Sequence, residues 1–426
     1  MDSFKMMHVP FNGVRYRGKP VLHFLRKAIG YAVYYLSKLF PRKVNKWCFG
    51  CETGFDGNAK YLFFDVVYNH PEINAVWITH RKAEAKSLRS KGFKAFHWLH
   101  PAGIWHCFTA KVYIATHQIS DINAYTSGNA FYVNIWHGVG VKKMRWLKLD
   151  RIREEFGYSS VERMCRSIFF KIEMFYLLYR KPDLMLVPSR FQADQFFAPM
   201  MDIPLSDCFL GGYLRNGILQ WNKERILDFV RRYEPHETLS LLEELNEYKK
   251  VYIYMPTWRK DKPDFMADSD IDWAVLDETL KAAGAILLLK LHPRTCLNGV
   301  LLAERYDNIR SIPDCCDIQQ VLPFTDCLIT DYSSVYADYC LLNKEIILFP
   351  FDYDSYVRGS HELPGYDRYY LGRRAYSFEE LLDLIRNRTD CHLTEEEHAF
   401  VMETYWDSAF NGVDIINEIK HRIGML

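Results

Sequence analysis

The first recurring pattern in the chain is an apolar face with helical spacing between residues 22 and 40. Apolar side chains return there every three or four residues, which places them on one face of an α-helix; they are Leu22, Leu25, Ile29, Val33, Leu36 and Phe40. Basic residues and tyrosines lie elsewhere around this helix. The pattern fits two structures, a basic helix on an anionic membrane surface and a surface helix packed on its own domain.

From Trp47 onward, short apolar runs alternate with helical stretches. Eight runs are apolar enough to form buried strands: residues 76–79, 112–116, 131–136, 184–188, 251–255, 286–291, 327–330 and 346–350. Buried strands separated by helices predict parallel sheets with helices on both faces. The expected fold class is therefore α/β, with two doubly wound, Rossmann-type domains.

A polar, charged segment at residues 220–250 interrupts the series of strands, and we expect the domain boundary near Asp207–Trp221. The chain of 426 residues is longer than a usual single domain. We therefore predict a basic amphipathic segment (1–46), an N-terminal Rossmann-like domain (47–206) and a C-terminal Rossmann-like domain that ends in helices (207–426).

Charge and cysteine content narrow the classes of function. The formal net charge is +1, so no overall field favours nucleic acid as a partner. Residues 1–46 are locally basic, and a second basic, aromatic, amphipathic helix is predicted at 161–181. The longest clean apolar run near the start is too short to span a bilayer, so contact with an anionic membrane is expected to be peripheral. Eleven scattered cysteines favour a reducing cytoplasm over a disulfide framework.

The strand predicted at 131–136 leads directly into His137 and Gly138. Ligands of open α/β sheets bind beyond the carboxyl ends of the strands. A histidine there can take a proton from an attacking hydroxyl, whereas the structural alternative is a histidine that only caps the strand. Lys142 and Lys143 add positive charge nearby, so Gly138 and the two lysines are candidate residues for the acceptor or the cleft.

Three strand ends in the second domain carry cationic, hydroxyl and carboxyl side chains. These side chains belong to Thr257, Arg259, His292, Arg294, Asp331, Ser333 and Ser334. Arginine binds phosphate oxygens in a forked geometry, and the amides at a helix start bind anions. Asp331 or Ser333 would also cap the helix that follows. Together the three ends predict a pocket for a pyrophosphate.

Other motifs are weaker. Residues 47–51, Trp-Cys-Phe-Gly-Cys, have the spacing of a redox motif. The polar residues 42–46 before them argue against the buried strand that a redox fold would place there. A second cysteine pair for zinc is missing, as are a P-loop, a dinucleotide fingerprint and a nucleophile turn. No carboxylate pair has an obvious metal-holding spacing, so we expect no metal or other cofactor.

The four strand-end motifs, taken in order, resemble the CDP-glycerol glycerophosphotransferase family, the primases and polymerases of teichoic acid and some capsule synthesis. They read Trp136-His-Gly138, Met255-Pro-Thr-Trp-Arg259, His292-Pro-Arg294 and Thr330-Asp-Tyr-Ser-Ser334. Weaker matches are Phe49-Gly50 with Asn58, Gly212-Tyr-Leu-Arg-Asn216 and Leu348-Phe-Pro-Phe-Asp-Tyr353. The resemblance covers roughly residues 47 to 354. Arg215 and Asn216 lie within it and become candidate cleft residues.

The resemblance implies a GT-B-like architecture with an active site in the interdomain cleft, and peripheral attachment to the cytoplasmic face of the cell membrane. It implies His137 as the base and His292 as a second catalytic group. His292, Arg294, Ser333 and Ser334 would hold the donor's phosphates. Where the family usually has Thr-Pro after His-Gly, this chain has Val139-Gly140, and an expected Gly-Pro appears as Gly372-Arg373. These departures leave the substrate more open than the reaction.

The expected function is transfer of a polyol phosphate, with glycerol favoured, from CDP-glycerol or CDP-ribitol to a lipid-linked saccharide or polyol-phosphate acceptor, with release of CMP. The small size beyond two domains favours priming or short chains over long polymers. Two alternatives stay open. One is a GT-B glycosyltransferase that uses a nucleotide-sugar donor, and the other is a non-catalytic binding protein of the membrane surface.

Overall fold

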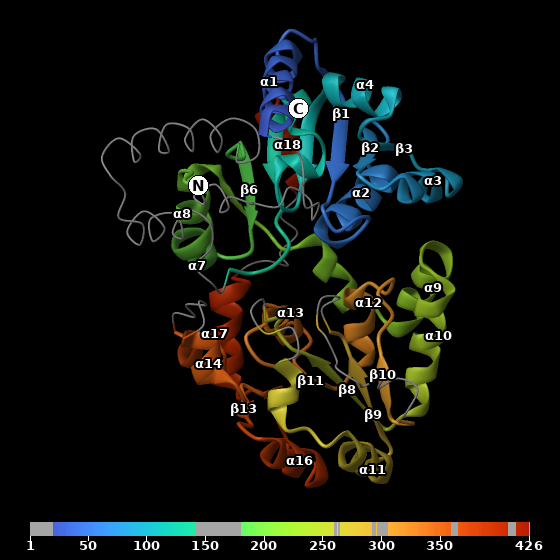
Figure 1. Cartoon of the computed structure of the whole chain (residues 1–426), viewed down its shortest axis with the longest axis vertical. Coiled ribbons are helices and arrows are strands. Elements are labelled where there is room, and N and C mark those ends of the chain that lie inside the picture. Colours follow the sequence, from blue (N-terminus) through green and yellow to red (C-terminus); the bar gives the residue numbers. More distant parts are fainter. Residues whose placement is uncertain are drawn as a thin grey trace. The chain divides into compact units, whose positions relative to one another are not determined.

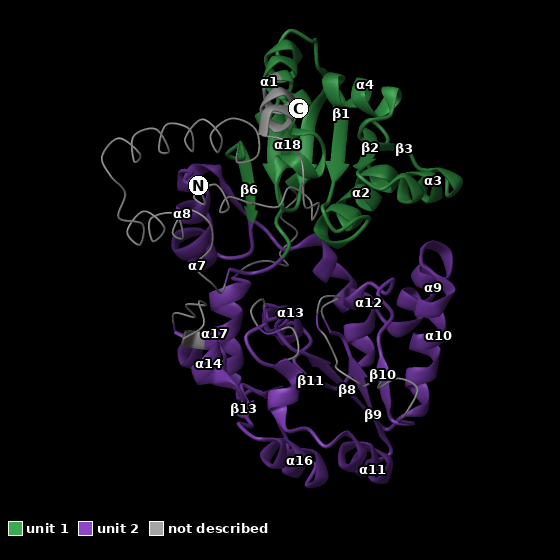
Figure 2. Cartoon of the chain, viewed as in Figure 1, with its two compact units in different colours: residues 1–137, 156–186, 414–426 green, residues 138–155, 187–413 purple. Residues whose placement is uncertain are grey.

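The chain forms two compact units, each built around a parallel sheet (Figures 1 and 2). The computed structural model describes residues 20–140, 180–259, 262, 265–291, 295, 306–358, 365–407 and 415–425, and the side chains of its first helix from Ile29 onward. The first unit comprises residues 1–137, 156–186 and 414–426, and the second comprises 138–155 and 187–413. The predicted α/β class with two Rossmann-type sheets is confirmed.

The first sheet has the strand order β3-β2-β1-β4-β5-β6-β7. Its strands are β1 (Lys43–Gly50), β2 (Asn74–Thr79), β3 (Ala95–His97), β4 (Ala110–Ala115), β5 (Phe131–Asn134), β6 (Leu184–Val187) and β7 (Cys208–Leu210). The helices of the first unit are α1 (Pro20–Ser37), α2 (Gly57–Asn69), α3 (Lys82–Ser90), α4 (Pro101–Thr109) and α18 (Ile415–Arg422). The paired strands β1 to β5 are parallel throughout, so their carboxyl ends share one edge of the sheet.

Strand β1 was not expected from the sequence, because residues 42–46 are polar. It lies in the middle of the sheet, between β2 and β4, with Trp47, Cys48 and Phe49 fully buried. Lys46 is also buried, and its Nζ donates to Thr109 Oγ1 at 2.7 Å, which compensates for removing the ammonium group from water. The argument that no buried strand precedes Cys51 was therefore wrong. Cys48 and Cys51 are both free thiols.

The second sheet has the strand order β10-β9-β8-β11-β12-β13. Its strands are β8 (Lys250–Met255), β9 (Ala285–Leu289), β10 (Ile309–Ser311), β11 (Cys327–Thr330), β12 (Glu345–Leu348) and β13 (Arg373–Arg374). Every pair in this sheet is parallel. Because β8 and β11 are neighbours in register, Met255 lies opposite Thr330 and the segments that follow both strands leave the sheet side by side.

The α-helices that the structure describes in the second unit lie between residues 187 and 413. They are α7 (Arg190–Gln192), α8 (Ala198–Met201), α9 (Lys223–Tyr233), α10 (His236–Glu244), α11 (Trp273–Ala283), α12 (Ile318–Val321), α13 (Val335–Cys340), α14 (Tyr353–Arg358), α15 (Tyr366–Tyr369), α16 (Phe378–Arg386) and α17 (Glu395–Tyr405). Leu276 and Leu280 of α11 and Leu381 and Ile385 of α16 bury their apolar faces in one core with β8 and β9. Burial of such side chains contributes about 1.5–3 kcal/mol each.

The division of the chain differs from the boundary expected near residues 207–221. The second unit already begins at Gly138 and, after a return to the first, resumes at Val187. The last helix, α18, belongs to the first unit although it was expected in the second domain. Lys420 of α18 reaches Glu72 at 2.5 Å, and this contact lowers the pKa of the Glu72 carboxyl to about 2.

Helix α1 confirms the helix predicted from residue 22 onward, but its packing face is not the predicted apolar one. Gly30, Tyr34 and Ser37 are buried against the first unit. Gly30 packs against the Tyr125 ring so closely that a Cβ there would lie 2.1 Å from it. Ile29 and Leu36, from the predicted apolar face, are 63% and 50% exposed. Val33, from the same face, is half-buried, so the described part of the predicted apolar face is turned only partly away from the unit.

Candidate active site

The backbone that leads to His137 is held in a strained conformation. Strand β5 ends at Asn134, and Trp136 has a φ of 45°, which side chains other than glycine rarely adopt. Asn134 Oδ1 accepts from the Trp136 amide at 2.9 Å. The buried amide of Asn58, at the start of α2, donates to the carbonyls of Ile135 at 3.0 Å and Trp136 at 2.9 Å. These bonds fix the turn that presents His137.

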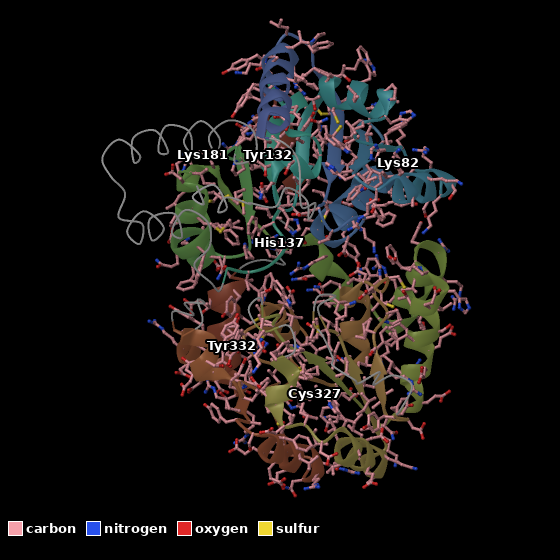
Figure 3. The ribbon with its side chains drawn as sticks, viewed as in Figure 1. Lys82, Tyr132, His137, Lys181, Cys327 and Tyr332 are labelled. Carbon is pink, nitrogen blue, oxygen red and sulfur yellow. The ribbon has the colours of Figure 1, made fainter. Side chains whose placement is uncertain are left out.

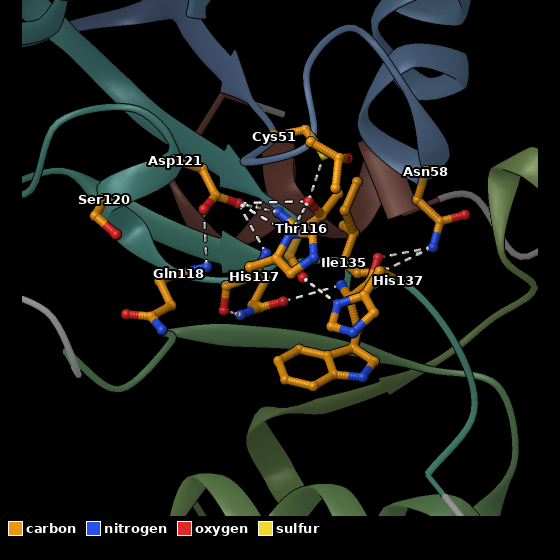
Figure 4. Close-up of polar contacts among 12 residues, drawn as sticks. Cys51, Asn58, Thr116, His117, Gln118, Ser120, Asp121, Ile135 and His137 are labelled. Carbon is orange, nitrogen blue, oxygen red and sulfur yellow. Dashed lines mark hydrogen bonds and ion pairs between the residues drawn. The ribbon is translucent and has the colours of Figure 1, made fainter. Parts of the chain in front are cut away.

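The His137 side chain is partly exposed at the carboxyl end of β5 (Figures 3 and 4). Its ring stacks on the Trp136 ring at a centroid distance of 4.4 Å and on the His117 ring at 4.1 Å. Its Nδ1 lies 3.3 Å from the carbonyl oxygen of Thr116. A carbonyl can only accept, so Nδ1 carries the proton in this contact.

His117 follows β4, the strand beside β5, and no motif in the sequence indicated it. Its Nδ1 lies 2.9 Å from Thr116 Oγ1 and 3.7 Å from the buried carboxylate of Asp121. Burial lowers the pKa of His117, but hydrogen bonding and charge from Asp121 and Cys51 outweigh burial and raise this pKa to about 10. The rule that ligands gather beyond strand ends, applied to the predicted strand at 112–116, would have found this residue.

Glu52, His117 and Asp121 bring possible metal-ligand atoms within 4.8 Å of one another. Asp121, however, already accepts from the backbone amides of Thr116, His117 and Gln118 (Figure 4). Asp121 and His117 are therefore already engaged with each other and with the backbone.

In the second unit, Asp331 joins the two central strand ends. Its buried carboxylate accepts from the amide of Thr257, at the end of β8, at 2.8 Å. The Thr330 hydroxyl donates to the carbonyl of Met255 at 2.8 Å, which adds a second link between the same strands. Among the described residues, the buried hydroxyl of Thr257 has no hydrogen-bond partner. Asp331 thus ties the two strand ends together, and the Thr257 hydroxyl beside it is a buried group without a partner in the described parts of the chain.

Arg259 is buried in an ion-pair network, where we had predicted a phosphate ligand. Its Nε and Nη2 donate to the two oxygens of Asp352 at 2.9 and 2.8 Å, and Nη2 lies 2.8 Å from Asp331. The guanidinium also packs over the rings of Tyr332 and Tyr356. Burial lowers the pKa of Arg259, and the two carboxylates raise it further than burial lowers it. The paired N–H donors of the Arg259 guanidinium are therefore occupied by Asp352. This ion pair holds the segment after β8 in place.

Ser333 and Ser334 are partly exposed after β11, as a phosphate-binding role requires. A Cβ at Gly138 would lie 3.2 Å from Ser334 Oγ, so glycine allows the close approach of these two segments. The Tyr213 hydroxyl donates to the Gly138 carbonyl at 2.8 Å. Residues 138–140 are held at their other end by Gln192, which accepts from the Gly140 amide at 2.6 Å.

Arg215 and Asn216, candidates for the acceptor or the cleft, are instead buried around Asp338 of α13. Arg215 Nη2 lies 2.6 Å from Asp338, and the Asn216 side-chain amide donates to the same carboxylate at 2.9 Å. A buried carboxylate needs such partners. The two residues therefore anchor the segment of 3₁₀-helix from Leu214 to Gln220 to α13, and both are buried.

The remaining predicted site residues, Lys142, Lys143, His292 and Arg294, lie outside the described residues, as does the predicted basic helix over residues 161–179. In the parts of the chain that the structure describes, no helix is both long enough and apolar enough to cross a membrane.

The two parallel-sheet units, with their polar strand ends, define a protein of the GT-B class. Residues 34–407 match the family described as "CDP-Glycerol:Poly(glycerophosphate) glycerophosphotransferase". The chain belongs to this family, and the predicted resemblance is confirmed.

Several relatives act in teichoic acid synthesis. Teichoic acid poly(glycerol phosphate) polymerases of Staphylococcus epidermidis and Bacillus spizizenii are 29% and 26% identical over 54% and 59% of this chain. The matched parts span only 30% and 59% of those two polymerases. A teichoic acid glycerol-phosphate transferase of Staphylococcus aureus is 23% identical over 80% of this chain and 85% of its own length.

Among solved structures, the wall teichoic acid polymerase TagF resembles this chain with a TM-score of 0.66 and 18% identity, over 95% of this chain and 97% of that one. A TagF variant was also solved after soaking with CDPG. UDP-GlcNAc 2-epimerase from Neisseria meningitidis has a TM-score of 0.51 at 12% identity, over 88% of this chain and all of the other. At these identities the likeness concerns the fold alone.

Proposed function

We propose that this chain transfers a polyol phosphate, glycerol phosphate in the first instance, from a CDP-polyol to a hydroxyl group of a lipid-linked or polymer acceptor and releases CMP. The proposal rests on one observation above others. In a chain of the glycerophosphotransferase family, the strand-end histidine His137 is partly exposed, and the Thr116 carbonyl orients its ring through Nδ1. An oriented and accessible imidazole is what a general base requires.

In the proposed reaction, His137 Nε2 takes the proton of the acceptor hydroxyl. The acceptor oxygen forms a bond to the β-phosphorus of the CDP-polyol, and the bond from that phosphorus to the bridging oxygen breaks. CMP leaves with the electron pair of the broken bond. Negative charge grows on the leaving phosphate, so cations and hydrogen-bond donors there lower the barrier.

The second unit supplies the donor-binding groups in this proposal. The partly exposed Ser333 and Ser334 and the unpartnered hydroxyl of Thr257 support this role. His292 and Arg294 add the cationic charge predicted from the sequence. We propose that these groups suffice without a metal ion, which predicts undiminished turnover in the presence of a chelator.

We also propose that the protein lies on the cytoplasmic face of the cell membrane. Exposed apolar and aromatic side chains at the end of α1 and in the turn after it support this: Ile29, Tyr35, Leu36 and Leu39 are between 50% and 79% exposed. Lys38 accompanies them, with its ammonium 5.0 Å from the centre of the Tyr35 ring. A helix with apolar, aromatic and basic side chains on one exposed side suits an anionic lipid surface. Co-sedimentation with anionic vesicles should fall when Leu36 and Leu39 are both replaced by serine.

The deciding experiment is CMP release by the purified protein from CDP-glycerol and CDP-ribitol, each with and without a lipid-linked disaccharide acceptor. Acceptor-dependent release supports the proposal, the preferred nucleotide identifies the polyol, and the length of the product separates priming from polymerisation. Release of UDP from a UDP-sugar, with no CMP from either donor, would contradict it and favour a glycosyltransferase. No nucleotide release from any donor would favour a binding protein.

A further inference from the structure

Two histidines from neighbouring strands stack face to face in the first unit. Strands β4 and β5 run parallel in register, with Ala115 opposite Asn134. His117 comes two residues after the end of β4 and His137 three residues after the end of β5. Their ring centroids are 4.1 Å apart and their planes differ by 15° (Figure 4). At this distance, the charge on one ring strongly affects protonation of the other.

Thr116 links both rings. Its carbonyl oxygen lies 3.3 Å from His137 Nδ1, and its hydroxyl oxygen lies 2.9 Å from His117 Nδ1. The same hydroxyl lies 3.0 Å from the Cys51 sulfur and 3.4 Å from Asp121. A single residue therefore fixes the orientation of both imidazoles and connects His117 to its counter-charge.

The positive charge belongs on His117 rather than on His137. Asp121, whose side chain is only 2% exposed, lies 3.7 Å from His117 Nδ1. The hydrogen bonds and charges of Asp121 and Cys51 raise the pKa of His117 to about 10 in spite of its burial. Two stacked cations repel, and the ion pair with Asp121 therefore places the proton on His117.

The other titratable groups around this pair do not replace the charge of His117. His80, after β2, binds the Ser120 carbonyl at 2.9 Å, and burial lowers its pKa, so it is neutral. Glu52, after β1, is exposed. The charge of Asp121 is shared among three backbone amides and His117. Among the described residues, His117 is therefore a cation in ring contact with His137.

We propose that His117 is a positioning residue for His137: as an imidazolium stacked on the His137 ring, it keeps His137 in the neutral form that accepts a proton. This inference rests on the proposed function of His137 as the base. A base that is already protonated cannot take the acceptor's proton, so the ion pair of His117 with Asp121 extends turnover to lower pH.

The test is an NMR titration of the full chain labelled in its histidine rings, with signals assigned by single His→Gln variants. In the wild-type protein, the His117 ring should stay charged between about pH 5 and pH 9. In His117→Gln, the protonation midpoint of His137 should rise by about one pH unit or more. The acidic limb of the plot of turnover against pH should move to higher pH by the same amount. His117→Arg, which keeps a cation, should leave the midpoint closer to that of the wild type.

His80→Gln is the matched control, because it removes a neighbouring histidine that does not stack on His137. The protonation midpoint of His137 in this variant should equal that in the wild-type protein. An unchanged midpoint in folded His117→Gln would overturn the inference. So would a wild-type His117 that titrates near pH 6.5, a result that needs no variant. If the His137 midpoint shifts as expected while His137→Ala retains full turnover, the charge relationship stands and the proposed base is wrong.

Discussion

The side-chain amide of Asn58 holds Trp136 in its left-handed conformation by donating to the Trp136 carbonyl at 2.9 Å. Its second bond, to Ile135, satisfies the preceding carbonyl. Asn58 is completely buried at the start of α2, so water cannot replace it. A residue 79 positions upstream of His137 in the chain therefore determines where that histidine points.

Replacing Asn58 with alanine should both destabilise the protein and impair catalysis. The variant leaves two buried carbonyls without their donor, which costs about 1–3 kcal/mol for each such group. It also lets the strained turn at Trp136 relax, so His137 moves and turnover falls by roughly tenfold or more. Urea unfolding and CMP release measure the two effects. Asn45→Ala is the control, since the Asn45 bond to Glu72 is exposed and 3.5 Å long. Equal effects of both variants would contradict the role of Asn58.

Replacing His137 with alanine should reduce kcat about a hundredfold or more, because a general base contributes on that scale. The KM for CDP-glycerol should change little, because the donor groups are assigned to the second unit. His392→Ala serves as the control, since His392 is an exposed histidine paired with Asp390. Near-normal turnover by folded His137→Ala in a CMP-release assay would show that another group takes the proton.

Replacing Gly138 with alanine should weaken donor binding. The new methyl group would lie 3.2 Å from Ser334 Oγ, closer than most Cβ contacts, so the hydroxyl must move by a few tenths of an ångström. We expect the KM for CDP-glycerol to rise by roughly tenfold. Gly217→Ala is a matched control because a Cβ there meets no atom within 4 Å. Identical KM values for Gly138→Ala and Gly217→Ala would show that Ser334 does not contribute to donor binding.

Replacing Asp338 with alanine should destabilise the protein by about 3–5 kcal/mol, because the buried Arg215 guanidinium loses its counter-charge. Asp228→Ala breaks an ion pair whose side chains are 68% and 54% exposed, and it should cost under about 1 kcal/mol. Chemical denaturation compares the two. If Asp338→Ala were no more damaging than Asp228→Ala, Arg215 would not depend on Asp338, and its prediction as a cleft residue would regain support.

The raised pKa of His117 makes stability depend on pH. The folded protein holds this proton up to about pH 10, whereas the unfolded chain releases it near pH 6.5. The stabilisation is therefore complete below about pH 6.5 and is lost as pH rises towards 10, by at most about 1.4 kcal/mol per pH unit. Urea unfolding at several pH values should show wild type and His117→Gln converging as pH rises. A constant difference between them would mean that His117 is neutral in the folded protein.

The predicted strands were found because a buried strand in a parallel sheet is apolar on both faces. All eight predicted runs correspond to strands, from β2 at Asn74–Thr79 to β12 at Glu345–Leu348. Strand β1 was missed because Lys43 and Lys46 interrupt its apolar pattern, and Lys46 is buried only with the help of Thr109. That compensation comes from 63 residues away, where a local pattern cannot show it.

The expectation that functional side chains follow the carboxyl ends of strands placed His137, Thr257 and Ser334 correctly after β5, β8 and β11. The same expectation does not distinguish side chains that bind a ligand from side chains that bind each other. Arg259 and Arg215 have the chemistry of phosphate ligands, but Asp352 and Asp338 occupy them. Their partners lie 93 and 123 residues further along the chain, so only the fold reveals which arginine is already neutralised.

The return of α18 to the first unit has a consequence for biosynthesis. Residues 415–422 complete a unit that begins more than three hundred residues earlier, with Lys420 bound to Glu72. A ribosome makes the chain from its N-terminus, and units commonly fold as they emerge. Most of the second unit, residues 187–413, is therefore synthesised before the last element of the first becomes available. During translation, the surface of the first unit that α18 covers therefore stays uncovered until the last residues are made.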